Sequence, residues 1–420
     1  MNVLIIGNGA REHTLAWKIS QSPKADNLYI APGNAGTASI AQNLAISAGD
    51  VQGLVRAAQD NKIDLVMVGP EDPLTKGIID SLDQLGIPAF GPNQKAAQIE
   101  GSKVFAKELM FKYGIPCAKS ATFTSFEDAC DYAKQQPLPL VIKADGLAAG
   151  KGVIIVTTYE EAVIALDDIM KKKVFGDAGN RSLVEECLVG REASLLAFTD
   201  GETLTPMVPA CDYKRALDGD KGPNTGGMGC YSPSEFFTPE LREHVMETVM
   251  KPTVNAMAQE GCPYKGVLYA GLMITADGPK VLEFNARFGD PETQVILPLL
   301  KTDFVNIMQA VIENRLAQVS IEWSDESCVG VVLSSAGYPE SYKKGFPISG
   351  LSDVNKDTLI FHAGTATNGT GQVVTDGGRV LTVVAKGKTY SDARDKVYQD
   401  VEKINFEGCQ YRKDIAIIEP

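Results

Sequence analysis

Several kinds of site are excluded by what this chain of 420 residues has little of. Its three histidines, His13, His244 and His362, are widely dispersed, so neither a histidine metal site nor a catalytic triad is predicted. The eight cysteines include no Cys-x-x-Cys pair, which disfavours a zinc site and a disulfide framework and favours reduced thiols. No apolar run is as long as a membrane span, and the chain begins with an apolar strand instead of a secretory signal. We therefore expect a soluble, cytoplasmic protein without a membrane partner.

Basic residues are also in short supply. The 40 Lys and Arg residues are outnumbered by 53 Asp and Glu residues, giving a formal net charge of −13. Nucleic-acid partners call for clustered positive charge, so we expect none, whereas small phosphorylated substrates need only local cations. The composition is otherwise that of a globular protein, and the length allows two or three domains. We expect a monomer that acts on small molecules.

The residues from Val281 to Phe288 are predicted to form a strand whose two faces differ in chemistry. Successive side chains of a strand point to opposite faces. One face is then apolar, formed by Leu282, Phe284, Ala286 and Phe288. The other carries Glu283, Asn285 and Arg287. Because Mg²⁺ is usually held by one or two protein oxygens plus substrate phosphates, Glu283 and Asn285 are predicted metal ligands, and Arg287 a charge clamp for a phosphoryl group.

The alternative is an antiparallel strand with its polar face in water. The residues that follow favour a site instead. Gly289-Asp290-Pro291 is predicted to stop the strand, with Asp290 capping a helix that Pro291 begins.

This segment also carries a family resemblance. Glu283-x-Asn285-x-Arg287 resembles the metal-binding strand of the ATP-grasp ligases. The continuation from Arg287 to Gln294, Arg-Phe-Gly-Asp-Pro-Glu-Thr-Gln, resembles the signature of the phosphoribosylamine–glycine ligase family. The similarity extends from residue 2 to about residue 415. It implies ATP, glycine and 5-phosphoribosylamine as substrates, with Mg²⁺ or Mn²⁺ as the metal.

The N-terminal region is predicted to contain three strand–loop–helix units, with strands at 2–6, 27–31 and 63–68. Their loops, rich in Gly, Pro and Asn, fall at the carboxyl edge of one parallel sheet, where such sheets bind ligands. Glu12 stands where a dinucleotide-binding turn would have its third glycine, so NAD is disfavoured. The alternative is that the loops are only tight turns. The resemblance implies that they bind the phosphoribosylamine through Gly9, Ala10, Arg11, Asn34, Gly36 and Glu71.

The segment from Lys143 to Gly152 is predicted to be a glycine-rich hairpin that closes over phosphates. A classical P-loop would have Ser or Thr after Gly-Lys and run into a helix, whereas here Gly152 and the strand Val153–Val156 follow. The alternative is a surface hairpin with two idle lysines. We expect residues 146–152 to be a mobile lid that ATP orders.

The resemblance implies further nucleotide contacts. A predicted helix from Glu100 to Tyr113 carries Lys103, and a predicted strand at 182–188 leads into the adenine-binding hinge. Glu185 and Leu188 would meet adenine through main-chain groups, and Glu192 the ribose. The implied nucleotide set is Lys103, Lys143, Gly150, Lys151, Gly152, Glu185, Glu186, Leu188 and Glu192.

A long loop runs from Asp212 to Gly229, and its consecutive glycines suit an anion-binding nest, although the loop could instead be disordered. The resemblance implies that Asp212 meets the glycine ammonium and that Lys214 or Arg215 lies near phosphates. The implied catalytic residues are Arg287, Asp212 and Lys214. Further implied substrate contacts are Arg215, Gly226, Gly227, Met228, Gly229, Asp290, Pro291 and Glu292. No acidic residue lies between Gly266 and Ile274, so the metal is predicted to rely on Glu283, Asn285 and nucleotide phosphates.

The predicted fold is α/β, with three domains. Residues 1–101 form a Rossmann-like parallel-sheet domain, and residues 102–322 an ATP-grasp α+β domain with a lid at about 122–189. Residues 323–420 form a small mixed α/β domain in which we find no chemistry. The hypothesis is ATP-dependent ligation of glycine to 5-phosphoribosylamine in purine synthesis. The alternatives are another ATP-grasp carboxylate–amine ligase, or a non-catalytic nucleotide-binding protein.

Overall fold

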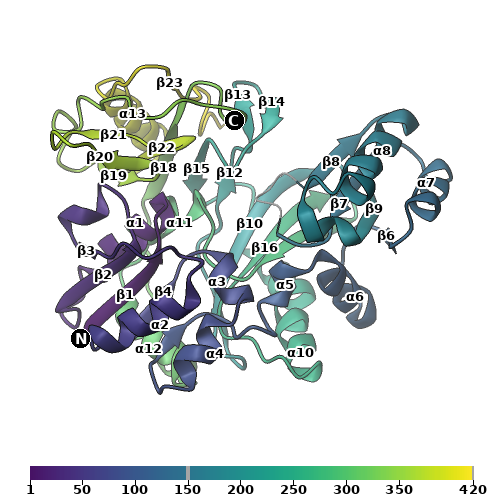
Figure 1. Ribbon diagram of the computed structural model, residues 1–420, viewed down its shortest axis with the longest axis horizontal. Coiled ribbons are helices and arrows are strands. Elements are labelled where there is room, and N and C mark those ends of the chain that lie inside the picture. The colour runs from purple at the N-terminus through teal and green to yellow at the C-terminus, as the bar shows by residue number, and fades with distance from the viewer. Residues whose placement is uncertain (148–151, 419–420) are drawn as a thin grey trace.

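A computed structural model describes residues 1–147 and 152–418 (Figure 1). The N-terminal region is a parallel sheet in the order β3-β2-β1-β4-β5. Its elements are β1 Asn2–Gly7, α1 Ala10–Ile19, β2 Asn27–Pro32, β3 Gln42–Asn43, α2 Val51–Asp60, β4 Leu65–Val68, α3 Glu71–Thr75, α4 Ile78–Asp83 and β5 Ala89–Phe90. Residues 3–6 of the central strand β1 are buried on both faces, which explains their unbroken apolar run. The predicted parallel sheet is confirmed.

The central region is built on an antiparallel sheet in the order β11-β10-β16-β17. Its strands are β10 Arg191–Thr199, β11 Leu204–Pro206, β16 Gly266–Thr275 and β17 Gly278–Asn285. The helices of this region are α5 Gln98–Gly101, α6 Lys103–Tyr113, α9 Pro239–Val245, α10 Lys251–Gln259, α11 Glu292–Ile296 and α12 Phe304–Ile312. One face of the sheet packs on α6 and α10, and the other on α12 and the N-terminal sheet.

A smaller sheet, in the order β6-β9-β7-β8, projects to one side with its own apolar core (Figure 1). Its elements are β6 Ser120–Phe123, α7 Phe126–Lys134, β7 Leu140–Ala144, β8 Val153–Val156, α8 Tyr159–Leu166 and β9 Ser182–Glu186. β7 and β8 pair antiparallel, with Lys143 opposite Val153. The glycine-rich segment therefore joins two hydrogen-bonded strands, as the sequence predicts.

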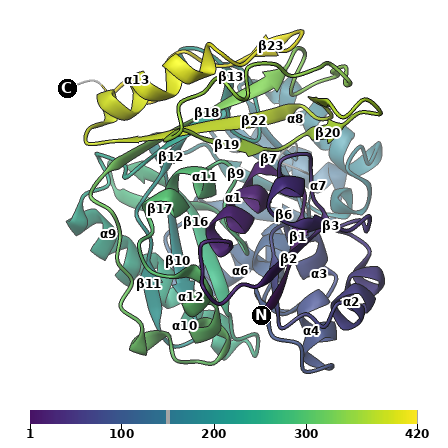
Figure 2. The same cartoon turned by 90° about the vertical axis from the view of Figure 1, so that its left-hand side faces the viewer.

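The C-terminal sheet has the order β12-β15-β18-β22-β19, with β23 beside β18. Its elements are β12 Cys211–Asp212, β15 Gly229–Ser232, β18 Ser327–Ser335, β19 Leu359–His362, β22 Arg379–Gly387, α13 Tyr390–Val401 and β23 Cys409–Gln410. Two small hairpins are β13 Arg215–Leu217 with β14 Lys221–Asn224, and β20 Thr365–Thr367 with β21 Val373–Thr375. This region lies above the N-terminal sheet in Figure 2. Because β12 and β15 belong to it, the long loop begins and ends on the C-terminal sheet; the boundary predicted at residue 322 stays a prediction.

Three short 3-10 helices lie between these elements. Thr37–Ser39 follows β2, Gly176–Asn180 precedes β9, and Leu297–Leu299 follows α11. A fourth lies at Leu316–Gln318, and π-helical turns occupy Asp167–Lys171 and Met246–Met250. In the part of the chain that the structure describes, no helix is long and apolar enough to cross a bilayer.

Three local predictions are wrong in detail. The helix predicted from Glu100 is divided at Ser102, whose hydroxyl caps α6 by accepting from the Phe105 N–H. The strand predicted to reach Phe288 ends at Asn285, and a bulge between its pairing with Gly271 and Leu272 turns Val281, not Leu282, into the core. Asp290 does not cap the next helix: its carboxylate instead accepts from Gln294 Nε2 at 2.8 Å.

Candidate functional site

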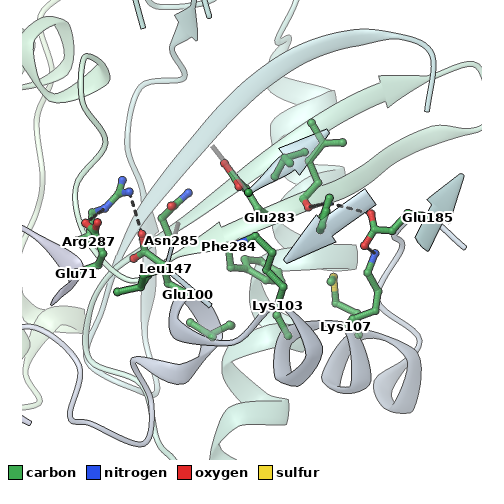
Figure 3. Close-up of a pocket in the computed structure, with 17 residues that line it drawn as sticks. Glu71, Glu100, Lys103, Lys107, Leu147, Glu185, Glu283, Phe284, Asn285 and Arg287 are labelled. Carbon is green, nitrogen blue, oxygen red and sulfur yellow. Dashed lines mark hydrogen bonds and ion pairs between the residues drawn. The ribbon is translucent and has the colours of Figure 1, made fainter. Parts of the chain in front are cut away.

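The end of β17 lines a pocket together with α6 and the β7–β8 hairpin. Glu283, Phe284 and Asn285 come from this strand, and Lys103 and Lys107 from α6 (Figure 3). The bulge brings Leu282 to the pocket as well, which alternation alone did not predict. The two oxygen-bearing side chains predicted as metal ligands therefore share one cavity with cationic side chains.

Glu283 is surrounded by lysines. Although burial alone would raise the pKa of its carboxyl, the charges of Lys214, Lys143 and Lys103 hold that pKa below its usual value. Lys103 Nζ donates to the Gly146 carbonyl at 2.9 Å, and burial lowers its pKa in spite of Glu283. The carboxylate of Glu283 is thus ionised, and with the Asn285 amide oxygen it offers the hard ligands that Mg²⁺ prefers. Within the described ranges no cluster of three or more His, Cys, Asp or Glu side chains could hold a metal.

Glu185 is buried between two lysines. Its oxygens lie 2.9 Å from Lys143 Nζ and 3.2 Å from Lys107 Nζ. Lys143 also donates to the Leu282 carbonyl at 3.0 Å, next to Glu283. Lys143 therefore lines the pocket, but its charge is already paired with the Glu185 carboxylate. The role implied for Glu185 by the resemblance involved its main chain and not this carboxylate.

The remaining predicted nucleotide residues lie on several elements: around the end of β9, on β10 and just before β8. The Glu186 carboxylate accepts from the Lys119 N–H at 2.9 Å, and Leu188 is partly exposed after the end of β9. Glu192 lies on β10, and its carboxylate pairs with Lys214 at 3.1 Å. Gly152 lines the pocket, whereas Gly150 and Lys151 lie outside the described residues. The predicted ATP-ordered lid includes them and stays a prediction.

Arg287 lies just beyond β17 and is held by two carboxylates. Its Nη2 lies 2.9 Å from Glu100 Oε1, and its Nε lies 3.3 Å from Glu71 Oε2 (Figure 3). The second oxygen of Glu100 accepts from the Ala286 N–H at 2.7 Å. Burial raises the pKa of Glu100 to about 7 against the opposing charge of Arg287. The structure thus joins Glu71, the first residue of α3, directly to Arg287, which follows β17.

Asp212 and Lys214 lie at the start of the long loop. Burial raises the pKa of Asp212 to about 7, against the charge of Lys214. Asp212 and the neighbouring carboxylate of Glu192 in turn hold the pKa of Lys214 well above its usual value, although burial disfavours the charge. The charge of Glu283 in turn contributes to the raised pKa of Asp212, and that of Lys214 lowers the pKa of Glu283, so the three side chains influence one another.

Glu292, an implied substrate contact, is buried in a hydrogen-bonded cluster whose other members the sequence did not predict. Its Oε1 accepts from the Tyr269 hydroxyl at 2.6 Å and from Ser194 Oγ at 3.3 Å. The two hydroxyls lie 2.7 Å apart. A side chain at Gly289 would collide with Glu292, because an added Cβ would lie 2.2 Å from Oε2. The sequence signal for the partners is weak: each is a polar residue with apolar neighbours on a strand, Ser194 on β10 and Tyr269 on β16.

The N-terminal loops turn toward the same region. The Gly9 N–H donates to Glu12 Oε2 at 2.7 Å, and Arg11 Nη1 donates to the Phe288 carbonyl at 3.1 Å. Ala10 begins α1 and is buried. The side chain of Asn34 shapes its own loop by accepting from the N–H of Gly36 at 2.9 Å. Gly9, Arg11 and Asp290 are brought together, since a Cβ at Gly9 would lie 3.4 Å from Asp290 Oδ2.

The glycines of the long loop have most of their N–H groups engaged within the protein. The N–H of Gly226 donates to Tyr338, that of Gly227 to Thr225, and that of Met228 to the Tyr213 carbonyl. The adjacent Gly229 begins β15, and the Arg215 guanidinium donates to the Gly222 carbonyl. The predicted anion nest is therefore not formed by these three N–H groups. Pro291 lies against Gly227, as an added Cβ there would come 2.4 Å from its Cδ.

The comparisons with known proteins agree along the whole chain. Three family models of phosphoribosylglycinamide synthetase match this chain. The N domain matches residues 1–100, the ATP-grasp (A) domain residues 101–293 and the C domain residues 328–417. A phosphoribosylamine–glycine ligase from Halalkalibacterium halodurans is 51% identical over 99% of this chain and 96% of its own length. One from Yersinia pestis is also 51% identical, over 99% of this chain and 98% of its own.

Solved structures extend this likeness to three dimensions. The crystal structure of phosphoribosylamine–glycine ligase from Thermotoga maritima superposes with a TM-score of 0.88 at 35% identity, covering 99% of this chain and all of that one. A biotin carboxylase from Campylobacter jejuni has a TM-score of 0.76 at 14% identity, covering 97% of this chain and 92% of that one. The second likeness concerns the fold alone.

Proposed function

The chain belongs to the phosphoribosylamine–glycine ligase family, and on that premise we propose that it joins glycine to 5-phosphoribosylamine, driven by the cleavage of ATP to ADP and phosphate. The products are glycinamide ribonucleotide, ADP and phosphate. The observation that carries the proposal is the pocket in which Glu283 and Asn285 face Lys103 and Lys143. The full-length identity of 51% to ligases of this name supports it.

The reaction proceeds in two displacements. A glycine carboxylate oxygen attacks the γ-phosphorus of ATP, and ADP leaves, so that a glycyl phosphate forms. The amine nitrogen of phosphoribosylamine then attacks the acyl carbon, loses a proton and expels phosphate. Neither step needs a covalent enzyme nucleophile, so the protein contributes positioning and charge stabilisation.

The nucleotide occupies the pocket of Figure 3 in this proposal. Lys103 and Lys143 supply positive charge to the phosphates together with Gly152, and the proposal adds Gly150 and Lys151, which lie outside the described residues. Glu185, Glu186, Leu188 and Glu192 line the path from adenine to ribose. Glu283 and Asn285 hold Mg²⁺ or Mn²⁺, which when bound neutralises phosphate charge.

The two other substrates meet beyond the end of β17. Asp212 receives the glycine ammonium, and the buried Glu292 lies among the charges that affect Asp212. Gly9, Arg11, Asn34 and Gly36 receive the phosphoribosylamine from the N-terminal edge. Arg287 lies between the two groups and stabilises the transferring phosphoryl group once it exchanges a carboxylate partner for it. We propose that the enzyme works as a cytoplasmic monomer in purine biosynthesis, without nucleic acid.

The test is ADP release by the purified chain with ATP and Mg²⁺, against a panel of amino acids, with phosphoribosylamine generated in situ. We expect release only when glycine and phosphoribosylamine are both present. Release with another amino acid or amine would identify a different carboxylate–amine ligase. ATP binding without release under any combination would identify a nucleotide-binding protein that is not an enzyme.

A further inference from the structure

The C-terminal sheet reaches the proposed substrate region through Arg379, the first residue of β22. Its Nη1 donates to the Gly226 carbonyl at 2.6 Å and to the Asp290 carbonyl at 3.0 Å. The same nitrogen lies 3.1 Å from Asp290 Oδ1, and the side chain is only 22% exposed. One guanidinium therefore joins two segments that are far apart in sequence, both of which carry predicted substrate contacts.

Tyr338 strengthens the same junction. Its hydroxyl accepts from the Gly226 N–H at 2.9 Å, so the C-terminal region engages both the N–H and the carbonyl of this glycine. Gly227 then packs against Pro291 with φ of +111°, a conformation that favours glycine. The end of the long loop, between β14 and β15, is thus fixed from one side by Arg379 and Tyr338 and from the other by the segment after β17.

The C-terminal region also holds the second N-terminal loop. The His362 carbonyl accepts from Asn34 Nδ2 at 2.8 Å, and the His362 N–H donates to His13 Nδ1 at 2.9 Å. The Thr365 carbonyl accepts from the Ala35 N–H at 3.3 Å. A region without predicted chemistry therefore contacts the backbone or side chains of two of the loops proposed to receive substrate.

We propose that Arg379 is a positioning residue that fixes the end of the long loop, at Gly226, against Asp290 and so shapes the binding region for the phosphorylated amine. The inference rests on the proposed function. The amine is the substrate affected because Asp290 lies beside Gly9, at the N-terminal edge, whereas the nucleotide pocket is lined by Lys103 and Lys143. The planar, multi-donor guanidinium suits this junction, and a lysine ammonium would hold it less rigidly.

Steady-state kinetics of full-length Arg379→Met tests this assignment. We expect KM for in situ phosphoribosylamine to rise about ten- to a hundredfold, as for lost hydrogen bonds to a charged group, with ADP affinity within about twofold of wild type. Lys386→Met is the matched control. It lies on the same strand, loses the same charge, and removes an ion pair with Glu326 at 2.8 Å away from this junction.

Two milder variants keep the test decisive should Arg379→Met fold poorly. Tyr338→Phe removes only the hydroxyl at Gly226, and we expect KM for the amine to rise about two- to tenfold. Arg379→Lys should recover most of the thermal stability without recovering KM, because the charge is kept and the junction is not.

Amine KM values equal to those of Lys386→Met would overturn the assignment. The assignment would also be overturned if ADP affinity and melting temperature fell in parallel with the rise in KM. Arg379 would then be a general stabilising residue. A wild-type protein that releases no ADP with glycine and phosphoribosylamine would instead refute the proposed function.

Discussion

Glu283 and Arg287 lie on one short segment, yet their surroundings are opposite. Within residues 1–147 and 152–418, no hydrogen bond or ion pair engages the Glu283 carboxylate, on which longer-range charge from three lysines and Arg287 acts. Arg287 is clamped by Glu71 and Glu100. Lys143 is likewise paired, with Glu185. The protein thus leaves the Glu283 carboxylate ready for a cation, while Arg287 and Lys143 must exchange carboxylate partners before they can meet phosphate.

The largest expected effect comes from removing the charge of the Glu283 carboxylate. We predict that Glu283→Gln folds normally and loses about 10²–10³-fold in Mg²⁺-dependent turnover, as for a lost group that acts on transition-state charge. The measurement is rate against Mg²⁺ concentration, with Glu326→Gln as a control at the surface pair with Lys386. Wild-type rates at limiting Mg²⁺ would remove Glu283 from the ligand set.

The guanidinium side is tested by Arg287→Lys. We predict that kcat falls by about 10²–10³-fold with ATP affinity little changed, because a point charge replaces a planar fork at the transferring group. The structural alternative is that Arg287 serves only its salt bridges, which run to Glu71 and Glu100. Normal kcat with a lowered melting temperature would assign Arg287 to those bridges alone; Arg315→Lys, at a surface pair, is the control.

A smaller effect is expected from the two lysines that pair with Glu185. Lys143 and Lys107 both contact Glu185, but of the two only Lys143 also reaches the Leu282 carbonyl, on β17. We expect Lys143→Met to weaken ATP binding about tenfold, as for one charged hydrogen bond, and Lys107→Met to weaken it by less than about threefold. Titration calorimetry of both variants is the measurement. Equal losses would mean that the two lysines act only by neutralising Glu185.

The smallest effect concerns the partner of Arg287. Glu100 has its pKa raised to about 7 in the folded protein, so the folded state binds more protons than the unfolded state between about pH 4.5 and 7. Its contribution to stability is therefore present at low pH and declines as pH rises through this window. We expect Glu100→Gln, which cannot ionise, to gain about 1–2 kcal/mol relative to wild type across it. Thermal unfolding from pH 4.5 to 8 measures this, and a difference independent of pH would contradict it.

Local patterns were sufficient for the main elements. The apolar run of β1, the strand at residues 153–156 and the polar positions Glu283 and Asn285 follow from alternation and turn residues, which depend on neighbours in sequence. Even so, the bulge at Leu282 escaped prediction, because it arises from pairing with β16. The break at Ser102 escaped for a similar reason: Asp145 accepts from its hydroxyl at 3.0 Å and from the Val104 N–H at 3.1 Å.

The sequence by itself determined the family, the parallel N-terminal sheet and which residue types line the end of β17, because these depend on motif and periodicity. Only the tertiary structure decided which charges meet. Arg287 and Glu71 are 216 residues apart, and the partners of Arg379, Gly226 and Asp290, lie on separate segments. A charged side chain is compatible with many partners of opposite sign, and its choice among them depends on distances and burial that arise only when the sheets pack together.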